Sequence, residues 1–144
     1  MDNIITIPNI QEYTYQITNG NLVLTRIIPF IDEATLFKKN LLGSTIVECK
    51  INNINNDIHK YKKLLIYLYS ITDIETILQN SILNISQQEI YEKGFKYYKQ
   101  LGLSIQGADA RRSIKEIINI IKIKKYSMEL KIKLKNDEII RFII

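Results

Sequence analysis

The sequence predicts a single α+β domain spanning residues 1–144, with antiparallel hairpins near both ends and helices between them. Three observations support this prediction. Apolar and polar residues alternate over 12–28 and again over 128–143, as in strands with one buried face. Between these segments, apolar residues recur every three or four positions, which is typical of helices packed on a core. The length of 144 residues is usual for one domain.

The first hairpin is predicted around Asn19-Gly20, because this pair tolerates the positive φ angles of a type I′ turn. Pro29 has no amide hydrogen for a β-ladder, so the return strand is expected to end near Ile28. A two-residue loop places one apolar face inward and gives three cross-strand pairs: Ile17 with Leu22, Tyr15 with Leu24, and Tyr13 with Arg26.

A short helix is expected from Asp32, a favourable N-cap residue, to Leu41, and Gly43 closes it. A strand over 45–51 follows, in which Val47, Cys49 and Ile51 share one face. Cys49 is expected to be a buried and unreactive thiol, because no histidine or second cysteine lies nearby in the sequence to activate it.

Three helices are predicted in the middle of the chain. The first starts at Asp57, turns Ile58, Tyr61, Leu65 and Leu68 toward the core, and leaves His59 on a polar face. The motifs Thr72-x-x-Glu75 and Ser86-x-x-Glu89 match the capping box and predict the other two helix starts. The helix that begins near Ser86 is expected to continue to Leu101 and to stop at Gly102.

Asp109 is expected to cap a last helix whose apolar stripe is narrow, with Ile120 pointing away from it. The stripe consists of Ile114, Ile117, Ile118 and Ile121.

A second hairpin follows, with its turn at Asn136-Asp137. A two-residue loop pairs Ile132 with Arg141. A three-residue loop over 136–138 pairs Ile132 with Phe142 and Lys133 with Arg141, and is preferred because it keeps Arg141 off the apolar face. The final strand is expected to be an exposed edge that pairs with a partner protein, through Ile139, Arg141 and Ile143.

The net charge of +5 is unevenly distributed, because residues 1–90 carry a net −2 and residues 91–144 a net +7. A basic C-terminal third fits phosphate groups, and it fits a solvated lysine face equally well. The candidates for binding lipid headgroups form one patch if the second hairpin packs beside the last helix: Arg111, Lys115, Lys122, Lys131, Lys133 and Lys135.

No catalytic residue, metal site or cofactor is predicted. One cysteine and one histidine cannot form an intrachain disulfide or an ordinary structural zinc site. The motifs of phosphate-binding loops, serine hydrolases, zinc proteases and EF-hands are absent from the sequence. The sequence also begins without a secretory signal pattern, so synthesis in the cytoplasm without a Sec signal is expected.

The segments ITNGNLVLTRIIPF and GLSIQGADARRSIKEI, with the abundant Ile, Asn and Lys of a low-GC genome, carry a resemblance. The chain resembles the OrfX family, encoded by the orfX-type gene cluster that accompanies botulinum neurotoxins in clostridia, and matches its smallest members in size. The resemblance implies a non-enzymatic, neurotoxin-associated accessory protein, with a fold related to the tubular lipid-binding superfamily, in which a curved sheet wraps a long helix. It also implies a larger OrfX protein and phosphoinositide lipids as partners, and an extracellular location within a toxin-associated complex.

The alternative function is that of a small nucleic-acid-binding protein from a low-GC bacterium or phage. Single-strand binders interleave exposed aromatic and basic residues so that bases can stack. From Arg111 onward the aromatic residues are only Tyr126 and Phe142, and no helix-turn-helix or zinc motif is visible. The sequence therefore favours the interaction subunit over the nucleic-acid-binding protein.

Overall fold

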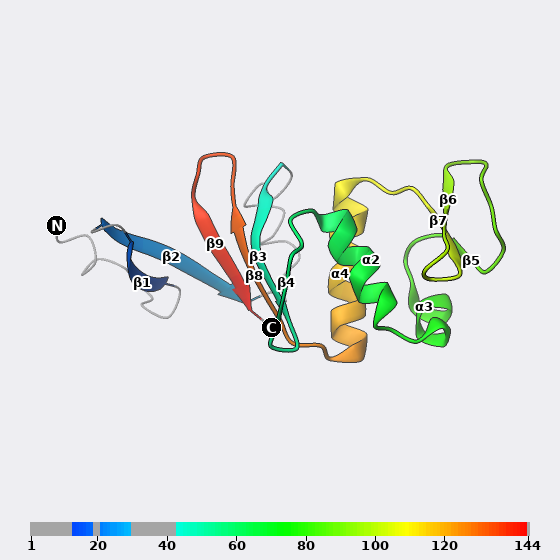
Figure 1. The fold of residues 1–144 in the computed structure, drawn as a ribbon, viewed down its shortest axis with the longest axis horizontal. Coiled ribbons are helices and arrows are strands. Elements are labelled where there is room, and N and C mark those ends of the chain that lie inside the picture. The colour runs from blue at the N-terminus through cyan, green and yellow to red at the C-terminus, as the bar shows by residue number, and fades with distance from the viewer. Residues whose placement is uncertain (1–12, 19–20, 30–42, 144) are drawn as a thin grey trace.

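The structure is a computed structural model that describes residues 13–18, 21–29 and 43–143. It has two sheets with helices between them, which confirms the predicted α+β class (Figure 1). The large sheet has the order β1-β2-β9-β8-β3-β4, formed by Tyr13–Thr18, Asn21–Pro29, Ile139–Ile143, Met128–Lys133, Thr45–Ile51 and Ile54–Asn56. The small sheet has the order β5-β7-β6, formed by Ile85–Ser86, Leu103–Gln106 and Phe95–Tyr98.

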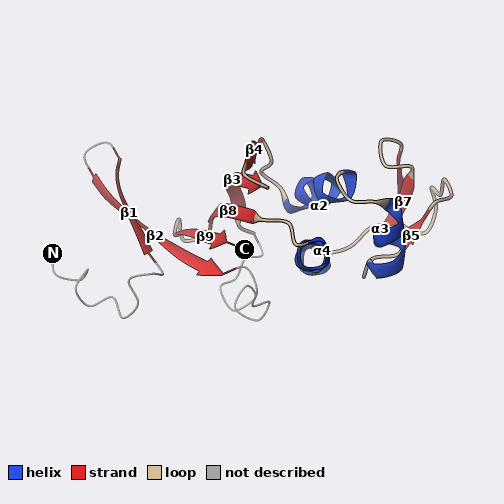
Figure 2. Cartoon of the chain, turned by 90° about the horizontal axis from the view of Figure 1, so that it is seen from below, coloured by secondary structure: helices blue, strands red, loops and turns tan. Residues whose placement is uncertain are grey.

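The described helices are α2 (Tyr61–Ser70), α3 (Ile74–Asn80) and α4 (Ala110–Lys124). Helices α2 and α4 lie between the two sheets, and α3 lies at the end that carries the small sheet (Figures 1 and 2). None of the helices within the described ranges is both long and apolar enough to cross a bilayer.

The N-terminal hairpin has the predicted register, in which Ile17 pairs with Leu22 and Tyr13 with Arg26. Strand β2 ends at Pro29, one residue beyond the expected position. The turn residues Asn19-Gly20 and the helix expected from Asp32 to Leu41 lie outside the described residues.

Strand β3 contains a β-bulge that the alternation of its sequence did not predict. The pairing with β8 shifts between Ile46 and Glu48, so Val47 is an extra residue in β3. As a result Ile46, Cys49 and Ile51 face the core, whereas Val47, which was expected there, is 39% exposed. The bulge changes which residues the strand buries.

The C-terminal hairpin forms, but both expected registers are wrong. Ile132 pairs with Ile140, and Lys131 pairs with Arg141. The loop has three residues, as preferred, but begins one residue earlier, because the Leu134 N–H donates to the Glu138 carbonyl at 2.9 Å. Each strand still buries its expected face, since the preferred register differs from the observed one by two residues.

The expectation that the last strand is an exposed edge is also wrong. Strand β9 pairs antiparallel with β8 on one side and parallel with β2 on the other. The backbone at Arg141 and Ile143 therefore lies inside the sheet, and Ile139 is paired with Lys133 of β8. Among the described strands, the edges of the large sheet are β1 and β4.

Two of the predicted helix starts in the middle of the chain are displaced. Helix α2 starts at Tyr61 rather than Asp57, and it buries Leu64, Leu65, Leu68 and Tyr69. Helix α3 is capped by Asp73, which accepts from the Thr76 N–H at 3.0 Å. The Thr72 hydroxyl, expected to be the cap, instead donates to the Leu68 carbonyl at 2.6 Å.

The helix predicted from Ser86 to Leu101 is wrong, because this segment forms β5 and β6. The Ser86 hydroxyl accepts from the Gln88 N–H at 3.0 Å, so it stabilises a turn. Lys93 and Gly94 then have φ angles of 56° and 79°, which no α-helix contains. Gly102, with φ of 65°, closes the turn between β6 and β7.

Helix α4 starts as predicted, because Asp109 accepts from the Arg112 N–H at 2.8 Å. The predicted stripe is buried, but Ile120, which was expected to point away, is also fully buried. Helix α4 has this second buried side because it lies between the two sheets (Figure 2). It therefore contributes to a core that extends from Ile140 and Phe142 of the large sheet to Leu103 of the small sheet.

Candidate functional site

The structure separates the residues predicted to bind lipid headgroups into two groups. Arg111, Lys115 and Lys122 lie on the exposed side of α4, at spacings of four and seven that align them. Lys131 and Lys133 alternate with the buried Leu130 and Ile132, which belong to the same core as α4. The two lysines therefore project from the opposite face of the sheet. Lys135 lies in the following turn, and these six residues do not form one patch.

The outward face of the large sheet is mixed in charge rather than basic. Glu129 forms an ion pair with Arg141, and the Lys133 ammonium nitrogen lies 3.3 Å from an Asp137 carboxylate oxygen. Lys131 stands opposite Glu48 in the ladder between β3 and β8. Acidic groups therefore offset the lysines on this face, which is a poor site for an anionic ligand.

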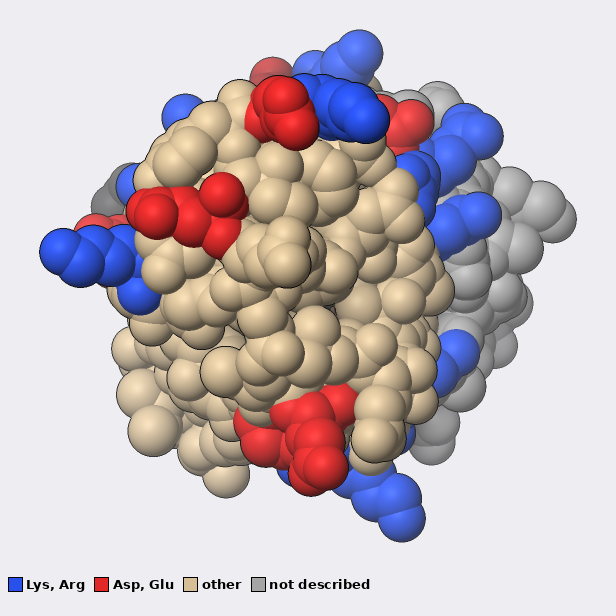
Figure 3. All heavy atoms as spheres, turned by 90° about the vertical axis from the view of Figure 1, so that its right-hand side faces the viewer, with Lys and Arg blue, Asp and Glu red and all other residues tan. Residues whose placement is uncertain are grey.

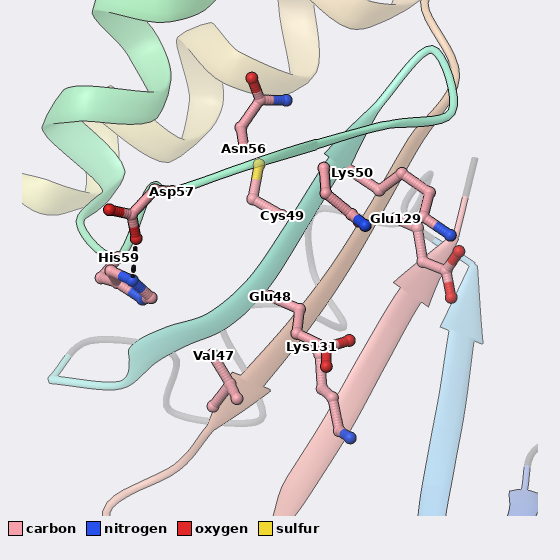
Figure 4. A pocket seen from close by; sticks show the side chains of 10 residues that line it. Val47, Glu48, Cys49, Lys50, Asn56, Asp57, His59, Glu129 and Lys131 are labelled. Atoms are coloured by element: carbon pink, nitrogen blue, oxygen red, sulfur yellow. Dashed lines mark hydrogen bonds and ion pairs between the residues drawn. The ribbon is translucent and has the colours of Figure 1, made fainter.

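A pocket of about 350 Å³ beside β3 and β4 brings together Cys49, Asp57 and His59 (Figure 4). These residue types form nucleophilic sites in some enzymes. Cys49 and His59 are ten positions apart in the sequence. The helix expected to start at Asp57 would have placed His59 on its polar face, away from the core that Cys49 faces. Only the tertiary structure places these three residues around one pocket, so their geometry decides whether they can form a catalytic site.

The geometry does not support a nucleophilic role for Cys49. His59 Nδ1 lies 2.9 Å from the Ile46 carbonyl oxygen and Nε2 lies 2.7 Å from an Asp57 carboxylate oxygen. These two hydrogen bonds raise the pKa of His59 and occupy both ring nitrogens. Burial raises the pKa of the Cys49 thiol to about 11, so the thiol is protonated near neutral pH.

A buried carboxylate that the sequence did not single out lies on α4. Glu116 is fully buried and accepts hydrogen bonds from the Tyr69 and Ser81 hydroxyls. The Asn119 side-chain amide donates to it at 2.9 Å, and the Ile82 N–H donates at 3.4 Å. These bonds join α2, α4 and the segment after α3. Because the carboxylate is enclosed by donors, its role is structural.

The best candidate for a binding site is a groove of about 620 Å³ between the exposed side of α2 and strand β6. We call it the lysine groove. Four lysines line it, and its ten lining residues include no carboxylate. The lining residues are Ile58, Lys60, Lys62, Lys63, Ile66, Tyr67, Ser70, Lys96, Tyr98 and Gln100.

Local structure explains how these side chains meet. In α2, Lys62, Lys63 and Ile66 lie on the side opposite the buried Leu64 and Leu68. In β6, the side chains of alternate residues share a face, so Lys96 and Tyr98 point the same way. The Lys96 ammonium lies 5.2 Å from the centroid of the Tyr98 ring, which is within cation–π range.

The lysine groove has an apolar extension. A cavity of about 60 Å³ shares Lys62, Ile66, Lys96 and Tyr98 with it, and Leu65, Leu83, Ile105 and Ala108 also line this cavity. The combined surface offers positive charge beside apolar walls. It is suited to a ligand that has both anionic and apolar parts.

Sequence reasoning missed this groove for two reasons. The segment that contains Lys96 and Tyr98 was predicted to be helical. Lys60, Lys62 and Lys63 also belong to the first 90 residues, whose net charge is negative. The available signal was the cluster of Lys60, Lys62 and Lys63 itself.

Comparison with known proteins adds no family assignment. No protein-family model, curated protein or solved structure gives a significant match to this chain. The candidate function therefore depends on the geometry and chemistry of the lysine groove.

Proposed function

We propose that the protein is a non-enzymatic binding protein that holds phosphorylated lipid headgroups, such as those of phosphoinositides, in the lysine groove. One observation carries this proposal: four lysines line a groove that also has apolar walls and no carboxylate among its lining residues. Phosphate oxygens can accept hydrogen bonds from several ammonium groups at once, and the glycerol and acyl carbons can contact Ile58, Ile66 and Tyr67. The resemblance to the OrfX family agrees with this ligand class.

The expected attraction is moderate and depends on salt. Each lysine near an anionic membrane surface contributes about 1 kcal/mol to binding. This attraction decays with distance from the membrane over a Debye length of about 8–10 Å at physiological ionic strength. Three lysines therefore contribute about 3 kcal/mol, which corresponds to roughly a 100-fold change in affinity.

Vesicle flotation with matched triple variants tests the proposal. In the groove variant, Lys62, Lys63 and Lys96 are replaced by Ala, and binding to phosphoinositide-containing vesicles is expected to weaken roughly 100-fold. The control replaces Lys131, Lys133 and Lys135 by Ala and changes the net charge equally, so its binding should stay near that of the unmodified protein. A third variant, with Ala at Arg111, Lys115 and Lys122, tests the helix group predicted from the sequence.

Two outcomes would contradict the proposal. One is flotation of the groove variant to the same extent as the unmodified protein, with both folded by circular dichroism. The other is equal loss of flotation in the groove and control variants, which would indicate attraction by net charge alone.

Binding of single-stranded nucleic acid is the second candidate, because residues 91–99 interleave tyrosines with lysines. Tyr91 and Tyr97 form an edge-to-face pair with ring centroids 6.3 Å apart, and Tyr91 is 72% exposed. The Tyr98 ring, however, already has Lys96 over it. Fluorescence anisotropy with random single-stranded DNA distinguishes the two candidates, because we expect weaker binding to DNA than to phosphoinositide vesicles at the same salt concentration.

A further inference from the structure

The end of the molecule formed by α3 and the segment between β5 and β6 exposes several large apolar side chains. Ile74 and Leu78 are 41% and 42% exposed, and their i, i+4 spacing places them side by side on α3. Ile82, in the segment that leaves α3, is 42% exposed, and Tyr91 is 72% exposed. We call these four residues and the surface around them the uncharged end.

Basic residues are scarce in the stretch of sequence that forms this end of the molecule. Between Lys63 and Lys93 the sequence has no basic residue, although the whole chain has 20 Lys and Arg. Figure 3 views this end directly and shows a broad area without charged side chains, with charged groups at its margin. The acidic residues of this stretch are Asp73, Glu75, Glu89 and Glu92.

The backbone behind the uncharged end is held by tertiary contacts. Asp73 forms an ion pair with Lys124 at 2.9 Å, and the Asn119 amide donates to the Asn80 carbonyl at 2.8 Å. The Arg112 guanidinium donates to the Ile82 carbonyl, also at 2.8 Å. A surface fixed in this way loses little conformational entropy when a partner binds.

We infer that the uncharged end is a docking surface for another protein whose contact face has an apolar centre and a basic margin. An area without charged groups, such as the one in the middle of Figure 3, is the pattern of the central part of a protein interface. Of the four acidic residues, Asp73 is paired with Lys124, and Glu75, Glu89 and Glu92 are exposed. The three exposed glutamates favour a basic partner, and they would repel the same acidic groups of a second copy or an anionic membrane.

Site-specific photo-crosslinking tests this inference in the cells that naturally produce the protein. A photoreactive residue replaces Leu78 at the uncharged end and, as the control, Lys131 on the outward face of the large sheet. We expect the Leu78 position alone to capture a protein, which is identified by mass spectrometry and purified. Titration should then show that Leu78→Asp weakens binding at least tenfold and Lys131→Ala less than twofold. Changing Glu75 and Glu92 to Lys should also weaken it.

Several results would overturn the inference. They are the absence of a specific crosslink at Leu78, equal capture at Lys131, or unchanged affinity of Leu78→Asp for the purified partner. Sedimentation of the protein alone completes the test. A dimer that Leu78→Asp dissociates would show that the occupant is a second copy of this chain.

Discussion

Glu116 is the residue on which the packing of several elements depends. Its hydrogen-bond partners Tyr69, Ser81 and Ile82 lie between 34 and 47 positions away in the sequence. A buried carboxylate is stable only when donors compensate for its lost hydration. Burial and the bond to Glu116 together raise the pKa of Tyr69, so this phenol remains a donor throughout the physiological range.

Replacement of Glu116 by Gln should therefore be costly. A side-chain amide nitrogen donates and accepts no hydrogen bond. Whichever way the Gln amide is turned, either the Tyr69 and Ser81 hydroxyls or the N–H groups of Ile82 and Asn119 therefore lose their acceptor, at a cost of about 1–3 kcal/mol in the free energy of unfolding. Urea denaturation measures this change. The exposed Glu92→Gln is the matched control, with an expected change within about 0.5 kcal/mol. Equal stability of the two variants would show that the Glu116 carboxylate is not needed.

Residue roles that depend on neighbours in sequence could be predicted, and roles that depend on distant partners could not. The capping role of Asp109 follows from an amide three residues later. The hydrogen bond of His59 with the Ile46 carbonyl depends on the path of β3, and no local sequence pattern predicts it. Glu116 was missed for the same reason.

Among the elements, the strand patterns were informative, whereas of the two capping-box motifs only the one at Thr72 marked a helix, whose start it misplaced by one residue. Two alternating segments gave both hairpins, because a period of two residues specifies which face is buried. The motif at Ser86 failed because a serine followed by polar residues forms a turn as readily as a helix cap. The bulge at Val47 was not predicted, although the adjacent apolar residues Ile46 and Val47 interrupt the alternation of the strand there.

The turn at Gly102 allows a test of the left-handed conformation that joins β6 to β7. Gly102 has a φ of 65°, and no atom lies within 4 Å of a Cβ placed there, so only backbone strain opposes a side chain. Gly102→Ala should lower the free energy of unfolding by about 1–2 kcal/mol, and Gly102→Asn by less. Thermal denaturation of both variants measures the difference.

Gly107→Ala is the control, because the nearest atom to its Cβ is the Gly94 carbonyl oxygen, at an ordinary contact distance of 3.6 Å. Its stability should stay close to that of the unmodified protein. If Gly102→Ala proves equally mild, the turn does not require the left-handed conformation.

At the scale of the whole molecule, charge counting along the chain was misleading. The basic third of the sequence is divided between the exposed side of α4, the outward face of the large sheet and strand β6, which carries Lys96. The lysine groove instead combines residues from an acidic part of the chain with Lys96. Surface charge depends on how the chain folds in space, and local patterns do not contain that information.

The resemblance to the OrfX family makes a prediction about assembly. We expect the protein to form a complex with the larger OrfX protein, so co-expression should give a single peak in size-exclusion chromatography. Independent elution of the two proteins at micromolar concentrations would contradict it. Leu78→Asp in the same experiment reports whether the uncharged end takes part, and a complex that tolerates this change uses another surface.

The parallel pairing of β2 with β9 has a consequence for the nascent chain. Arg26 pairs with Ile140, which is 114 positions later. At roughly 5–20 residues per second, a ribosome needs about 6–23 s to synthesise that interval. Throughout this time β2 can pair only with β1, and its other edge is open to neighbouring chains. The centre of the large sheet is thus completed late in translation, and the N-terminal hairpin is the part that most needs chaperone protection on the ribosome.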